Sequence, residues 1–142
     1  EFRRVLFRSY FVGPPSLAVL GLFIVSLALA ALLNFFMSYV MALLAFWLLE
    51  ISTLIFIVFA FEYMAGGHLF PIDILPPVVA KILAFTPFPY QLFFPVSLYL
   101  GRATGPELIR GLALQLFWVA FFYALARWTW NRGIRRYTAF GG

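Results

Sequence analysis

Forty consecutive residues, from Tyr10 to Leu49, include no Asp, Glu, Lys or Arg. A helical crossing of a bilayer takes about 20 predominantly apolar residues, so this run is long enough for two crossings. Over all 142 residues, 65% are hydrophobic and only 11% are charged, whereas about a quarter of a typical soluble domain is charged. The chain is therefore predicted to be an all-α integral membrane protein in the lipid bilayer, and a soluble enzyme is excluded as the leading interpretation.

Charge and cysteine content narrow the function further. The net charge of +5 comes from ten basic residues spread thinly along the chain, which does not form the basic face of a nucleic-acid binder. Cysteine is absent, so no disulfide framework, thiolate metal site or cysteine nucleophile is expected.

The first nine residues, Glu1–Ser9, read EFRRVLFRS and differ in character from the apolar run after them. They back-translate to the end of a common sequencing adapter, and we interpret residues 1–9 as a translated scar outside the fold. The alternative is a basic anchor preceding the first apolar run. With the scar removed, residues 10–142 are the membrane domain, and the native protein is expected to extend further toward its N-terminus.

The first half of the chain is predicted to cross the membrane three times. The spans are Ser16–Leu33, Phe35–Leu49 and Ile51–Ala65, with turns at Asn34 and Glu50. A turn is preferred at Glu50 because an ionised carboxylate near mid-membrane is costly. The alternative joins the last two spans into one long tilted helix.

A proline-rich stretch follows, between His68 and Gly105. It holds six of the nine prolines: Pro71, Pro76, Pro77, Pro87, Pro89 and Pro95. The charge-free run of 20 residues Ile82–Gly101 includes three of them. Proline inside a helix removes a hydrogen bond and crowds the preceding turn, so short helices that enter one leaflet and return are predicted instead of a regular span. Pro106 and Glu107 are typical of the start of the last crossing.

Orientation follows from the basic residues. The C-terminal tail has four of them: Arg127, Arg132, Arg135 and Arg136. The proline-rich stretch has only Lys81 and Arg102. The positive-inside rule then predicts a cytoplasmic C-terminus and Glu50 turn, with the proline-rich stretch and Asn34 outside.

Two kinds of candidate site residue stand out. Glu50 and Glu62 are intramembrane acids, and such residues are functional candidates by default. Glu50 is assigned to the cytoplasmic turn, and Glu62 either faces a water-filled path or bonds a neighbouring helix. His68 and Asp73 have the H-x4-D spacing of glycerolipid acyltransferases, but one His and a few acids give this spacing by chance, and an interfacial polar pair is the preferred interpretation.

Several motifs resemble one family when taken together. The run from Ala65 to Pro77 is similar to the A-G-x-x-x-P segment of ABC type-2 exporter permeases. Thr86-Pro87-Phe88, Phe94–Gly101, Ala45-Phe46-Trp47 and Arg135–Gly142 resemble further elements of the ABC-2 family, some of whose members are described as drug or viologen exporters.

This resemblance implies a six-helix permease of the bacterial inner membrane, of which the chain supplies the last three or four helices. It implies a second permease subunit and a separate ATP-binding-cassette ATPase subunit, so that the chain itself is neither an enzyme nor a cofactor binder. It also implies an outer gate made of re-entrant helices. The gate candidates are Glu62, Gly66, Gly67, His68, Pro71, Asp73, Pro76, Pro77, Pro87, Pro95 and Gly101. Membrane acyltransferase and structural membrane subunit are the competing functions.

Overall fold

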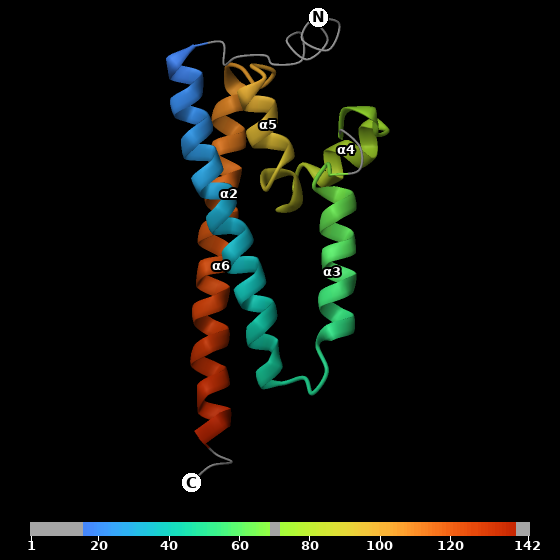
Figure 1. Cartoon of the computed structure of the whole chain (residues 1–142), viewed down its shortest axis with the longest axis vertical. Helices are drawn as coiled ribbons and strands as arrows, with labels where there is room; N and C mark the ends of the chain where they lie inside the picture. Colours follow the sequence, from blue (N-terminus) through green and yellow to red (C-terminus); the bar gives the residue numbers. More distant parts are fainter. Residues whose placement is uncertain (1–15, 69–71, 139–142) are drawn as a thin grey trace, which may run out of the picture.

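The computed structural model describes residues 16–68 and 72–138, without the side chains of Asp73 and of residues 136–138. Within these ranges all regular structure is helical. Two long helices, α2 and α6, lie side by side, and a shorter helix, α3, stands apart from them (Figure 1). The predicted scar at residues 1–9 and Pro71 lie outside the described residues.

The first helix, α2, spans Leu17–Leu43 without a break. Its 27 residues make it about 40 Å long, which is enough to cross the bilayer. The Ser16 hydroxyl accepts a hydrogen bond from the Val19 amide and caps the helix. The predicted turn at Asn34 is wrong, because Asn34 continues the helix and its side chain finds partners on other elements.

The chain reverses direction around Glu50. A short 3-10 helix, η1 (Leu44–Phe46), ends α2, and an exposed turn leads into α3 (Ser52–Ala65). The predicted turn at Glu50 is confirmed. With 14 residues, α3 is only about 21 Å long and is shorter than a hydrocarbon core of about 30 Å.

The proline-rich stretch folds into short pieces. We call residues 66–68 and 72–105 the outer segment. Its elements are η2 (Ile72–Ile74), α4 (Pro77–Leu83), η3 (Phe88–Tyr90) and α5 (Phe93–Tyr99). The prediction of short helices in place of a regular span is confirmed.

The prolines of the outer segment lie where helices begin. Pro77 opens α4, Pro87 precedes η3, and Pro95 is the third residue of α5. The first turn of a helix has no internal acceptors for its amides, so a missing N–H costs little there.

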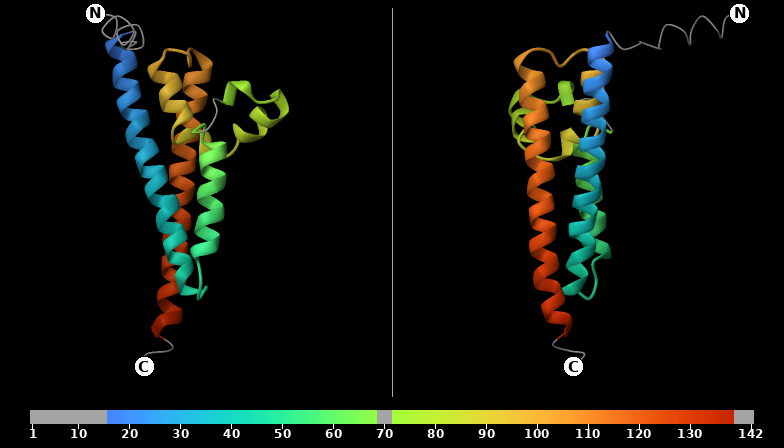
Figure 2. Two further views of the ribbon diagram at one scale, coloured as in Figure 1. Left: turned by 45° about the vertical axis from the view of Figure 1, so that its right-hand side comes forward. Right: turned by 90° about the vertical axis from the view of Figure 1, so that its left-hand side faces the viewer.

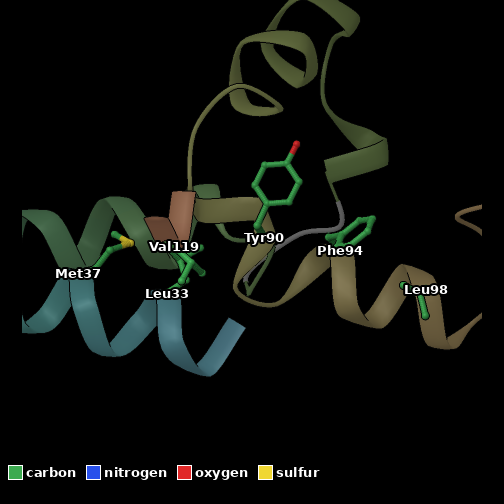
Figure 3. Packing of buried hydrophobic residues seen from close by; sticks show 6 residues of the cluster. All are labelled: Leu33, Met37, Tyr90, Phe94, Leu98 and Val119. Carbon is green, nitrogen blue, oxygen red and sulfur yellow. The ribbon is translucent and has the colours of Figure 1, made fainter. Parts of the chain in front are cut away.

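The last helix, α6, spans Pro106–Thr138 and begins at the predicted residue. It packs along α2, and α5 packs mainly against α2, as the two views of Figure 2 show. Toward α6, α5 places the Phe94 ring against Gly111. The main buried cluster joins Leu33 and Met37 of α2, Val119 of α6 and three residues of the outer segment, Tyr90, Phe94 and Leu98 (Figure 3).

The surface of this bundle is apolar. Large hydrophobic side chains are exposed along α2, α3 and α6, among them Ile24, Phe35, Phe56, Phe61, Leu116 and Phe117. Two stretches, Leu17–Phe46 and Pro106–Arg135, are long and apolar enough to cross a membrane, and Ser52–Ala65 is a shorter apolar helix. The described residues therefore have two helices long enough to cross a membrane and one shorter apolar helix in place of the four crossings predicted, because the first two predicted spans are one helix.

Candidate functional site

The candidate site is the junction between the outer segment and the long helices. At its entrance α3 ends at Ala65, and Gly67 takes the positive φ of 84° that lets the chain turn away. A Cβ on Gly67 would lie 3.2 Å from Cβ of Phe93 on α5. Only glycine meets both conditions easily, so Gly67 lets the chain turn away from α3, whereas Gly66 keeps a helical φ of −80°.

A buried glutamine joins three elements at this junction. The Gln115 side chain of α6 is 0% exposed and donates to the backbone oxygens of Ser26 and Tyr90, both at 2.9 Å. Its Oε1 accepts from the Ser26 hydroxyl at 3.0 Å. Backbone that is not helical has unpaired polar groups that lipid cannot satisfy. Gln115 supplies a partner to the carbonyl of Tyr90, where the outer segment is irregular.

A second polar group lies further along α2. The side-chain amide of Asn34 donates to Glu62 Oε1 of α3 and to Gln91 Oε1 just after η3, both at 3.3 Å. The Gln91 amide in turn donates to the Met37 sulfur at 2.9 Å. We call Asn34, Glu62 and Gln91 the Asn34 cluster. It joins α2, α3 and the outer segment, so Glu62 bonds a neighbouring helix, one of the two roles predicted for it.

A cavity of about 160 Å³ opens beside this cluster, between α2 and α3. Glu62 is on its wall, and the other lining side chains are mostly apolar, including Met37, Met41 and Phe59. The space is large enough for several water molecules.

Other side chains satisfy the backbone of the outer segment locally. The Tyr90 hydroxyl donates to the Ala84 carbonyl at 2.7 Å, and the Thr86 hydroxyl donates to the Leu83 carbonyl at 2.7 Å. A backbone bond adds to these: the backbone amide of Arg102 donates to the Ser97 carbonyl at 2.9 Å. These bonds close the turns that separate the short helices.

The remaining gate candidates occupy different positions in the outer segment. Pro87 and Pro95 are buried, Pro76 and Pro77 are exposed at the start of α4, and Gly101 has a φ of 68°. Gly66 is buried, and a Cβ there would lie 2.7 Å from the Glu62 carbonyl.

The H-x4-D pair gains no support. The exposed His68 ring stacks on Tyr63 with centroids 5.0 Å apart. Asp73 lies in η2, and its side chain is outside the described part. Among the described residues, no group of three or more His, Cys, Asp or Glu is placed to hold a metal ion.

The candidates assigned to the cytoplasmic side gather at the other end of the molecule. Glu50 is exposed in the turn after η1, and Arg127, Arg132 and Arg135 are exposed on the last turns of α6 (Figure 1). The Arg132 guanidinium lies 4.9 Å above the Trp128 ring. Arg136 is in the same helix, although its side chain is not described.

Three site residues, Gln115, Ser26 and Gln91, are not among those predicted from the sequence. Polar, uncharged side chains within apolar helices are the available signal, because they bond across helices in membranes. That signal identifies candidates but not partners, since Ser26 and Gln115 are 89 positions apart.

Helices of this length and apolar surface, with the buried amide of Gln115 between them, are typical of a multi-helix integral membrane protein. Compared with protein-family models, the chain matches the ABC-2 family transporter proteins over residues 15–141. The chain belongs to this family. Searches of curated proteins and of solved structures gave no significant match.

Proposed function

We propose that the chain is the permease subunit of an ATP-driven exporter and forms part of its translocation path. Membership of the ABC-2 transporter family over residues 15–141 is the observation that carries this proposal. ATP hydrolysis belongs to a separate ATPase subunit, and a second permease subunit completes the path. No observation favours an acyltransferase or a purely structural subunit.

The two ends of the bundle have different tasks in this proposal. The Glu50 turn and the C-terminal end of α6 lie at one end, and the outer segment lies toward the other (Figure 2). The basic residues of α6 favour a cytoplasmic location for the first end, in a bacterial inner membrane. The ATPase subunit would then dock there, and the outer segment would serve as the upper gate.

The Asn34 cluster offers a way to transmit movement between the ends. Because α3 runs from the Glu50 turn to Glu62 and Glu62 is bonded to Asn34, a displacement of the turn reaches the outer segment along one rigid helix. ATP binding on the partner subunits would rock the two permease halves and change these contacts. If this movement opens the path to one side and then to the other, the cluster must have two discrete arrangements, each favoured by one nucleotide state of the ATPase subunit.

Co-purification of the full-length protein with its ATPase subunit tests the assignment. The subunit should be retained, and its ATP hydrolysis rate should respond to a transported compound. A permease preparation that retains no ATPase and transports nothing in vesicles would contradict the proposal.

Two variants separate the gate from the docking surface. Gly67→Val introduces a β-branched residue at positive φ, and Pro87→Leu loosens a buried turn. Both should impair export while ATPase binding persists. Changes to Arg135 and Arg136 should first affect insertion or cytoplasmic contacts. Unimpaired export by Gly67→Val would show that the outer segment is not a gate.

Reporter fusions test the orientation independently. A reporter after Gly142 should be cytoplasmic, and one inserted near Gly105 should be external. The same location for both reporters would mean that α6 does not cross the membrane.

A further inference from the structure

A second, larger cavity lies in the outer segment, away from the Asn34 cluster. It measures about 410 Å³ and is bounded by α4, α5 and the start of α6. Ala80, Ala84, Phe93 and Leu114 contribute apolar walls. Among the described side chains, Arg102, Glu107 and Arg110 are the charged residues of its lining. Its volume lies in the range of small-molecule sites, about 300–1,000 Å³.

The lining of the cavity changes from charged to apolar along α6. Its charged residues lie in the loop before α6 and in the first turns of that helix, and Leu114 follows Arg110 by four positions. Four residues of helix correspond to about 6 Å, so a charged group and an apolar wall lie within about one turn of each other.

The charged end favours an anion. The described lining side chains there include two guanidinium groups and one carboxylate. The Arg110 guanidinium, which lines the cavity, lies 5.7 Å from the centroid of the Phe85 ring. Backbone bonds from the amides of Arg102 and Ala103 to Ser97 O fix the loop on the other side. Arginine binds phosphate oxygens through paired N–H donors.

We propose that this cavity binds a phospholipid with an anionic headgroup, whose phosphate contacts Arg110 and Arg102 and whose acyl chain lies along the apolar wall. Basic pockets between membrane helices bind lipid headgroups in this way. A free phosphate ion would leave the apolar wall empty, and a helix of a second permease would not require the paired guanidinium groups.

Native mass spectrometry of the delipidated full chain tests the proposal. The probes are dioleoyl-phosphatidylglycerol, dioleoyl-phosphatidylcholine and inorganic phosphate. Both lipids carry the phosphate, but the choline cation of phosphatidylcholine would lie near Arg110 and Arg102 and offset the anionic charge. Phosphatidylglycerol should therefore bind about tenfold more tightly than phosphatidylcholine. Inorganic phosphate should bind far more weakly than either lipid.

Three variants make the test specific. Arg110→Gln should abolish the preference for phosphatidylglycerol, and Ala80→Phe should weaken binding of both lipids by filling the cavity. Lys81→Gln is the matched control, because Lys81 is an exposed cation on α4 that does not line the cavity. It should retain the preference. Circular dichroism checks that each variant folds. If Ala80→Phe fails to fold, the lipid preference of Arg110→Gln still tests the proposal.

Several results would overturn the proposal. Equal binding of the two lipids, or a preference unchanged by Arg110→Gln, would exclude headgroup recognition. Phosphate binding as tight as that of phosphatidylglycerol would indicate an anion site without a lipid. Loss of dimers in Ala80→Phe with lipid binding intact would assign the cavity to a second copy of the chain. None of these readouts depends on transport, so the proposed permease function is tested separately.

Discussion

The α2–α6 pair and the outer segment meet the demands of the membrane in different ways. Each long helix satisfies its own backbone along most of its length, and its exposed surface can be uniformly apolar. The outer segment breaks its backbone repeatedly, so it depends on side chains and glycines elsewhere. The Tyr90 carbonyl needs Gln115 of α6, and the Phe94 ring needs the space left by Gly111 of α6. The regular region is thus the scaffold on which the irregular region is held.

The largest loss of stability is expected where α5 of the outer segment contacts α6. A Cβ on Gly111 would lie 2.0 Å from the Phe94 ring, whereas a Cβ on Gly21 of α2 would meet nothing within 4 Å. Gly111→Ala should lower the free energy of unfolding by about 1–3 kcal/mol, the usual cost of overpacking. Gly21→Ala, the matched control, should raise it by up to about 1 kcal/mol through helix propensity.

Unfolding by SDS titration in micelles measures both variants. A second change, Phe94→Leu, should recover part of the loss in Gly111→Ala because it removes the overlapping ring. Equal stabilities for the two glycine variants would show that α5 does not pack on α6 in this way.

A somewhat smaller effect is expected from Gln115→Leu. It removes both donors of the buried amide and should cost about 1–2 kcal/mol of unfolding free energy. Hydrogen exchange should rise most around Tyr90, since that carbonyl loses its partner. Ser26→Ala should cost less, because the two bonds from Gln115 to backbone carbonyls remain.

Ser38→Ala serves as the control for Ser26→Ala, since Ser38 is exposed on the same helix. A Gln115→Leu protein with unchanged exchange near Tyr90 would exclude the role given to this amide.

The Asn34 cluster should contribute less than the buried glutamine, because its bonds are longer and Asn34 is exposed. Asn34→Leu should cost about 0.6–1 kcal/mol, typical of a side-chain bond between membrane helices. The exchange of α3 amides should increase, because α3 has few other contacts with the rest of the bundle. Asn131→Leu, on an exposed face of α6, should change neither quantity. If Asn131→Leu lowered the unfolding free energy more than Asn34→Leu, the cluster would have no part in the proposed coupling.

The sequence predicts the scaffold better than the junction. Apolar length identifies the stretches that form α2, α3 and α6, although it divides α2 in two. The prolines and Gly67 mark helix ends, because these signals are local. Asn34 shows the limit of that reasoning: an isolated Asn within an apolar run is also typical of a turn. Its partners, Glu62 and Gln91, are 28 and 57 positions away. Contacts at such separations depend on how the helices pack, and no local pattern specifies this.

The smallest effect is expected at a helix end that belongs to the scaffold alone. Ser16 caps α2 by accepting from the Val19 amide at 3.2 Å. Ser16→Ala should cost about 0.5 kcal/mol, the low end for losing a cap, and hydrogen exchange should rise only in the first turn of α2. Ser52 is the matched control, because it begins α3 after Ile51, which makes no side-chain cap bond. Ser52→Ala should leave unfolding and exchange unchanged. If Ser16→Ala also increased exchange in α5 or η3, the stability of the outer segment would depend on the start of α2 as well as on Gly111 and Gln115 of α6.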